Sequence, residues 1–181
     1  MVELSVILAV ILLLLVAAGP GFSDALREWR LNTEINRLAT TIENARLDAI
    51  TLNAMTVVCP AIPHQDSVTC AGDDAGDWSG GYIAFRDNDR NHRFDPRRDQ
   101  VLARKSAVAT GLRLRLANAL ALHNRLQFMP DGRLRGGSAG IFSLCHPKNL
   151  MVERGLMVNL TGQVQRMSRD TVSKMECVTG T

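Results

Sequence analysis

An Asp-rich stretch in the middle of the chain has part of the residue pattern and spacing of a calcium-binding loop. In DNDRNHRFDPRRD (87–99), four residues stand at ligand positions one, three, five and nine: Asp87, Asp89, Asn91 and Asp95. Such a loop also needs a Gly at position six and a bidentate Glu at position twelve. This chain has His92 and Arg98 there. We therefore expect a polar connection between two strands, with no bound metal and no other cofactor.

Four cysteines lie beyond the apolar N-terminal run: Cys59, Cys70, Cys145 and Cys177. An even number of cysteines behind a membrane-targeting segment indicates an oxidising compartment and up to two disulfides, with three arrangements open. The spacing favours Cys59–Cys70, which would close a short Pro-rich loop, and Cys145–Cys177, which would pin the tail. A zinc site is the rival interpretation, but the sequence has no CxxC pair and its histidines are scattered.

Enzyme chemistry finds little support in the residue pattern. The sequence has no Ser/His/Asp arrangement, no paired-carboxylate motif and no Gly-rich phosphate loop. The formal charge of +3 comes from 21 basic and 18 acidic residues scattered along the chain, which describes a mildly basic surface. We expect a protein that is not an enzyme.

The N-terminus poses a problem of its own, because Glu3 borders an apolar run from Leu4 to Ala18. A charged side chain at the centre of a bilayer costs about 2.5–3.5 kcal/mol on insertion scales. A cleaved signal peptide would carry a basic n-region, which this segment lacks, although Ala17-Ala18-Gly19 would pass as a cleavage site. We favour a retained transmembrane segment over residues 1–22.

A helical pattern resumes after Pro20-Gly21, which loosens the helix. Seven apolar residues then recur at alternating spacings of four and three: Leu31, Ile35, Leu38, Ile42, Ala45, Ala49 and Leu52. This periodicity predicts an apolar seam on one face of an amphipathic helix over residues 23–55. The first 55 residues thus form one long helix, and the alternative is an export signal followed by an ordinary surface helix.

Residues 56–181 change period and predict a β-rich domain. The stretch 60–80 is rich in Gly, Asp and Pro and indicates a loop. Strand-like stretches occur at 57–60, 81–86, 100–105, 112–117, 125–129, 133–137, 140–144, 156–160 and 163–167. We expect about seven short, mostly antiparallel strands in an α+β fold, with one face of the sheet covered by the helix seam.

Several motifs now occur together in the order typical of one family. They are Val2-Glu3-Leu4 with Pro20 seventeen residues after Glu3, ENARLDAITLN (43–53), WSGGYIAFRD (78–87) followed by VLAR, FMPDGRLRGGSAGIFSLC (128–145) and LMVNLTGQVQ (156–165). The chain resembles the minor pilins and pseudopilins of bacterial type IV pili and type II secretion systems, within the GspH/FimT-type branch. The resemblance implies a type IV pilin-like fold, with the long N-terminal helix packed on a mostly antiparallel β domain.

The resemblance also implies a function. Such subunits sit in the bacterial inner membrane by a single N-terminal helix, hold the globular domain in the periplasm, and assemble with other pilin or pseudopilin subunits into filaments that they prime or cap. The matching glutamate of the family pairs with the N-terminal amine of a neighbouring subunit, which would explain Glu3; a solvated Glu3 among lipid headgroups is the alternative. Family precursors carry a short leader that is cut before N-terminal methylation, so we expect the true start codon upstream of Met1.

A second function in the family is recognition at the filament tip, of DNA, secreted substrate or a surface. DNA-uptake relatives carry Gly-Arg-x-Arg on a C-terminal hairpin, where this chain has Gly162-Gln163-Val164-Gln165. A similar GRLR occurs earlier, which leaves Arg133 and Arg135 as the candidates for phosphate contact. Their alternation with Leu134 favours a solvated strand face, and we expect no nucleic-acid partner.

Overall fold

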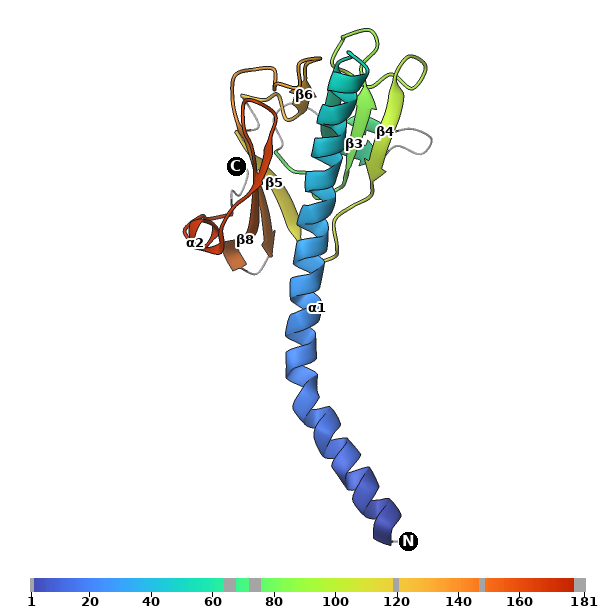
Figure 1. Ribbon diagram of the computed structural model, residues 1–181, viewed down its shortest axis with the longest axis vertical. Coiled ribbons are helices and arrows are strands. Elements are labelled where there is room, and N and C mark those ends of the chain that lie inside the picture. The colour runs from blue at the N-terminus through green and yellow to red at the C-terminus, as the bar shows by residue number, and fades with distance from the viewer. Residues whose placement is uncertain (1, 64–67, 72–75, 119–120, 147–148, 178–181) are drawn as a thin grey trace.

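A computed structural model of the chain describes residues 2–63, 68–71, 76–118, 121–146 and 149–177. Helix α1 (Val2–Thr51) is one continuous helix that runs through Pro20. Its C-terminal half lies against the β domain, while its N-terminal half projects away and bends to one side (Figure 1). Among the residues described, no helix combines the length and the apolar character needed to cross a membrane.

The predicted seam is buried along nearly all of its length. Six of its seven residues are at most 3% exposed: Leu31, Ile35, Leu38, Ile42, Ala45 and Ala49. The seventh prediction was wrong, because Leu52 is 46% exposed. Helix α1 ends at Thr51 and the backbone turns at Asn53, where φ is +48°. The chain therefore leaves the helix before Leu52 can continue the buried stripe.

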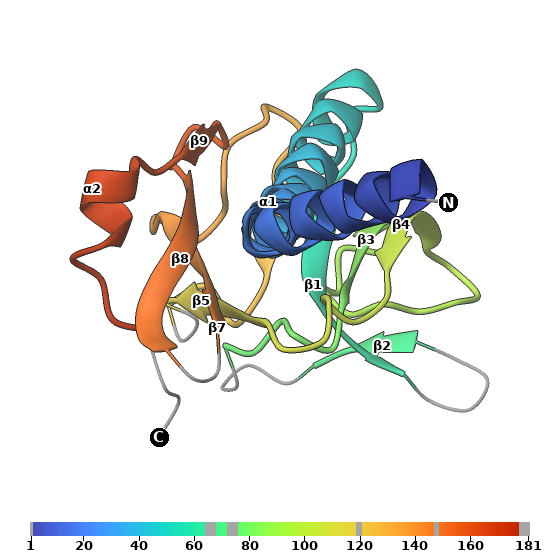
Figure 2. The same ribbon diagram turned by 90° about the horizontal axis from the view of Figure 1, so that it is seen from below.

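Two antiparallel sheets receive this seam, where the sequence predicted one. The first contains β1 (Thr56–Pro63), β2 (Val68–Cys70), β3 (Tyr82–Arg86), β4 (Gln100–Lys105) and β6 (Leu126–Phe128). Its order is β2-β1-β3-β4, with β6 also paired to β1. The second contains β5 (Arg113–Ala117), β7 (Gly140–His146), β8 (Asn149–Val158) and β9 (Val164–Arg166), in the order β5-β7-β8-β9. A short helix, α2 (Arg169–Val172), follows and lies beside β8 (Figure 2).

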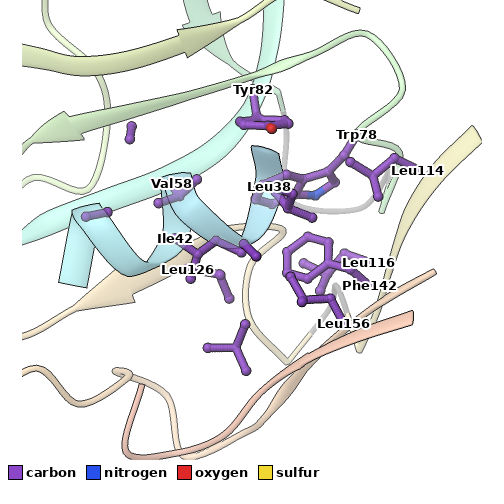
Figure 3. Close-up of a cluster of buried hydrophobic side chains, with 14 of the residues drawn as sticks. Leu38, Ile42, Val58, Trp78, Tyr82, Leu114, Leu116, Leu126, Phe142 and Leu156 are labelled. Carbon is purple, nitrogen blue, oxygen red and sulfur yellow. The ribbon is translucent and has the colours of Figure 1, made fainter. Parts of the chain in front are cut away.

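The core forms where α1 meets both sheets. Leu38 and Ile42 of the helix lie among Trp78, Phe142 and Leu156, all fully buried (Figure 3). The Trp78 and Phe142 rings meet edge to face at 4.8 Å, a favoured geometry for aromatic pairs. Because one helix face contacts both sheets, the second half of α1 is an integral part of the domain.

Some elements differ from the prediction. The stretch 133–137 is not a strand: only Leu134 forms an isolated bridge, and Gly136 and Gly137 have φ of +102° and +69°. The structure also has β2 inside the predicted loop, extends β8 back to Asn149, and adds α2.

Candidate functional site

The point where α1 leaves the domain is fixed by ion pairs. Glu28 pairs with Arg154 of β8 and with Arg169 of α2, the latter at 3.0 Å. Arg27, the residue directly before Glu28, pairs with Glu153. Arg154 Nε also donates to Asn32 Oδ1 at 3.0 Å. These contacts set the direction in which the projecting half of the helix leaves the domain.

The projecting half of α1 is rich in exposed apolar side chains. Among the described side chains before Leu31, those that are large, apolar and exposed are Leu4, Val6, Ile7, Leu8, Ile11, Phe22, Leu26 and Trp29. Phe22, Leu26 and Trp29 are spaced four and three apart, so they share one face, which we call the outer stripe. At 100° per residue this face lies about half a turn from the buried seam. Trp29 is 65% exposed there. Contiguous apolar surface of this kind marks a contact with lipid or with another protein.

Glu3 lies in the first turn of α1, at the far end of this apolar surface, and its side chain is exposed. Pro20 belongs to the helical backbone, but its side chain is outside the described part of the chain. The assembly roles of both residues stay predictions.

The Asp-rich loop 87–99 joins β3 to β4 at the distal end of the molecule, opposite the N-terminus (Figure 1). Carboxylates of Asp87, Asp89 and Asp99 come within 4.8 Å of one another. Asp95, the predicted position-nine ligand, is not in this group, and Asp99 replaces it. No pattern signal could have found Asp99, because it lies outside the twelve-residue template.

The loop uses these carboxylates to hold its own backbone. Asp87 accepts the backbone N–H groups of His92 at 2.9 Å and of Asn91 at 3.2 Å. Asp99 accepts those of Asp95 at 2.8 Å and of Asn88 at 3.0 Å. Burial raises the pKa of Asp87, the N–H group of His92 opposes the rise, and Asp99 adds to it. This arrangement is the polar connection that the sequence favoured.

Arg135 points into the same cluster, which the sequence did not foresee. Its Nη1 lies 2.5 Å from Nε2 of His92, and Arg125 donates to the His92 carbonyl. Arg133 is exposed, and its guanidinium has no partner among the described residues. The two arginines therefore differ: Arg135 joins two loops, while Arg133 faces solvent.

Two disulfides join Cys59 to Cys70 and Cys145 to Cys177. This is the arrangement that the spacing favoured. The first links β1 to β2, and the second ties the C-terminal segment to β7. All four cysteines are thereby in disulfides.

Comparison with known proteins gives one family and one fold. Residues 34–162, well over half of the chain, match the family model described as type II transport protein GspH. No curated protein matches. The chain is similar to two crystal forms of the type IV minor pilin FimU of Pseudomonas aeruginosa, each at 15% identity. The TM-scores are 0.61 and 0.58, with 84% and 81% of this chain covered and 98% and 99% of FimU. At this identity the likeness shows the type IV pilin fold alone, while the family match shows that the chain belongs to the GspH family of type II transport proteins, as a minor pilin or pseudopilin of the GspH/FimT type.

Proposed function

We propose that this protein is a minor subunit that primes or caps a filament, either the pseudopilus of a type II secretion system or a type IV pilus. Residues 1–22 would anchor it in the inner membrane and hold the β domain in the periplasm. Membership of the GspH family supports a structural role in one of these systems, in company with other pilin or pseudopilin subunits. Priming or capping is our proposal.

The observation that carries the proposal is the division of α1 into two surfaces. From Leu31 onward its apolar seam is buried by the chain's own sheets. Before Leu31 the large apolar side chains that the structure describes, including Phe22 and Trp29, are exposed. A helix held rigidly at one end and uncovered at the other is suited to move from lipid into a bundle of similar helices, because both environments cover its apolar surface.

Glu3 gives this transfer a direction. A carboxylate in hydrocarbon is costly, but one that meets an ammonium group of a neighbouring subunit in the bundle recovers part of that cost. Pairing that forms only after assembly would favour the docked state in one axial register.

The test uses the full chain, produced with its cognate filament system and carrying Glu3→Gln. We expect the variant to remain in the membrane fraction with both disulfides formed, but to be missing from sheared filaments. Glu43→Gln is the matched control, since Glu43 is exposed on the domain half of the same helix. Equal recovery of both variants in filaments would refute the role of Glu3.

A second measurement addresses priming. Deletion of this subunit should leave the major subunit in the membrane and reduce the number of filaments by at least about tenfold, which corresponds to about 1.4 kcal/mol in the nucleation barrier. Normal filament number without this subunit would exclude a priming role. Recovery of the mature chain from the periplasm without residues 1–22 would exclude the anchor as well.

A further inference from the structure

A polar groove runs along α1 where the helix passes the beginning of β3 and the end of β4. Its volume is about 590 Å³. The helix side contributes Asn36, Arg37 and Thr40, and the sheet side contributes Tyr82 and Lys105. Neither the family match nor the predicted assembly residues assign it a role.

Tyr82 brings an unsatisfied hydrogen-bonding group to this groove. The residue is 1% exposed and lies at the edge of the buried cluster (Figure 3). Its hydroxyl is buried without a hydrogen-bond partner among the described residues. Burial raises the pKa of Tyr82 to about 12, and the neighbouring Thr41 side chain opposes this rise. The Thr41 hydroxyl itself donates to the carbonyl oxygen of Arg37 at 2.9 Å. A buried hydroxyl without a partner costs folding free energy, which a bound acceptor would recover.

The charges around the groove favour a monoanion. Lys105 Nζ lies 3.6 Å from Oε1 of Glu34, whose side chain is only 9% exposed, so the charge of this lysine is already compensated. Arg104 also borders the groove. In the register of β3 and β4 it stands opposite Ile83, which packs in the cluster on the far face of the sheet. Strand alternation directs the Arg104 side chain to that far face. Among the described residues that line the groove, Arg37 is then the cation that remains for a ligand. The nearby Glu34 would repel a dianion more strongly than a monoanion.

The position of the groove indicates where the anion comes from. Asn36 lies seven residues after Trp29, and Thr40 lies fourteen residues after Leu26, so the groove continues the outer stripe toward the domain. Any chain that covers the stripe extends over the groove. We propose that the groove binds a carboxylate side chain of a neighbouring filament subunit, which accepts hydrogen bonds from the Tyr82 hydroxyl and the Arg37 guanidinium. The claim that the carboxylate belongs to a neighbouring filament subunit rests on the proposed function. The claim that the groove binds a carboxylate does not.

The site can be tested without any filament, because Tyr82 is the single tyrosine of the chain. The full chain in detergent micelles, labelled with 3-fluorotyrosine, gives one ¹⁹F resonance from the groove. We titrate it with sodium acetate at constant ionic strength, and with inorganic phosphate in parallel. We expect a saturable shift with acetate and at least about fivefold weaker binding in Arg37→Gln, the loss of one charge-assisted contact. Arg166→Gln, an exposed arginine of β9, is the matched control and should bind acetate as the parent does.

Each outcome of the titration supports or overturns the proposed carboxylate site. A shift that never saturates, or the same affinity in Arg37→Gln, overturns the site. Tighter saturation by phosphate than by acetate overturns the carboxylate assignment. In cells, Arg37→Gln should be recovered in filaments at a lower level than Arg166→Gln, and equal recovery overturns the neighbouring subunit as the source. If the parent chain binds acetate but never enters filaments, the proposed function fails while the carboxylate site stands.

Discussion

Nη1 of Arg135 lies 2.5 Å from Nε2 of His92. A guanidinium can only donate, so the imidazole must accept at Nε2 and carry its proton on Nδ1. That nitrogen faces Oδ2 of Asp87 at 3.4 Å. The neutral histidine therefore connects the turn that carries Arg135 with the Asp-rich loop. We call Asp87, His92 and Arg135 the distal cluster; it joins one of the two candidate arginines to the loop.

Protonation of His92 is expected to weaken the folded state. Burial lowers the pKa of His92, and Arg135 lowers it further. Asp87 opposes this fall, whereas Arg125 makes the fall larger. Because the folded-state pKa lies below the ordinary value of 6.5, the unfolded chain takes up the proton first. The stabilisation is thus complete above pH 6.5 and is lost as the pH falls from 6.5 through the folded-state pKa.

Urea unfolding at about pH 7.5 and about pH 5.5 measures this effect, since these values lie on either side of the ordinary histidine pKa of 6.5. The raised pKa of Asp87 acts in the opposite sense, favouring the folded state at low pH, so the parent must be compared with His92→Gln. The variant should lose less stability between the two pH values. Parallel losses in both proteins would contradict the assignment.

Arg135 and Arg133 should differ in their effect on stability. At about pH 7.5, Arg135→Gln removes the contact with His92 and should cost about 1 kcal/mol, the size of a partly exposed hydrogen bond. Arg133→Gln changes an exposed side chain without a partner among the described residues and should stay within about 0.5 kcal/mol. Urea denaturation of the two variants checks this, and equal costs would show that the Arg135 contact contributes nothing.

The helix seam could be predicted because its cause is local. Spacings of four and three place residues such as Leu31 and Ala49 on one face whatever covers them, and both are buried. The strand 100–105 was predicted with its observed bounds for a similar reason. The division into two sheets could not be predicted, because a period of two identifies a strand without naming its partner.

The distal cluster was missed because its members meet only after folding. Arg135 and His92 are separated by 43 positions, and no spacing rule connects them. The strand predicted at 133–137 failed on its glycines, Gly136 and Gly137, whose positive φ values suit turns and interrupt pairing. The outer stripe was also missed, although the spacing of Phe22, Leu26 and Trp29 is a signal that could have shown a shared face.

Gly162 should tolerate no side chain. Its φ is +77°, and an added Cβ would lie 2.2 Å from the carbonyl oxygen of Gly132. The same carbonyl accepts a hydrogen bond from Arg46 Nε at 3.0 Å, and this arginine also binds the Thr161 carbonyl at 3.2 Å. Gly162→Ala would separate the two turns that Arg46 holds against α1. We expect a cost of at least about 3 kcal/mol from backbone strain and the broken contacts.

The control for this effect is Gly137→Ala. Gly137 has a similar φ of +69°, but an added Cβ meets no atom of the described residues within 4 Å. Only the left-handed backbone penalty applies, about 1–2 kcal/mol. Thermal or urea unfolding of the two variants separates the cost of the left-handed backbone from the cost of the close contact with Gly132. Equal destabilisation would show that the two turns move apart without loss of stability.

The two disulfides should contribute unequally. Cys59 and Cys145 are both almost fully buried, at 0% and 1% exposure, so replacing either pair by alanine loses similar packing. The loops that they close differ, with sequence separations of 11 and 32. Loop-closure entropy then predicts a loss of about 2.8 kcal/mol without Cys59–Cys70 and about 3.7 kcal/mol without Cys145–Cys177.

The longer loop also holds Val172 of α2 against Val152 of β8, so its opening should release α2. Urea midpoints of the two double-alanine variants give the order, and a larger loss from the short loop would mean that local packing, not chain entropy, determines what each disulfide contributes.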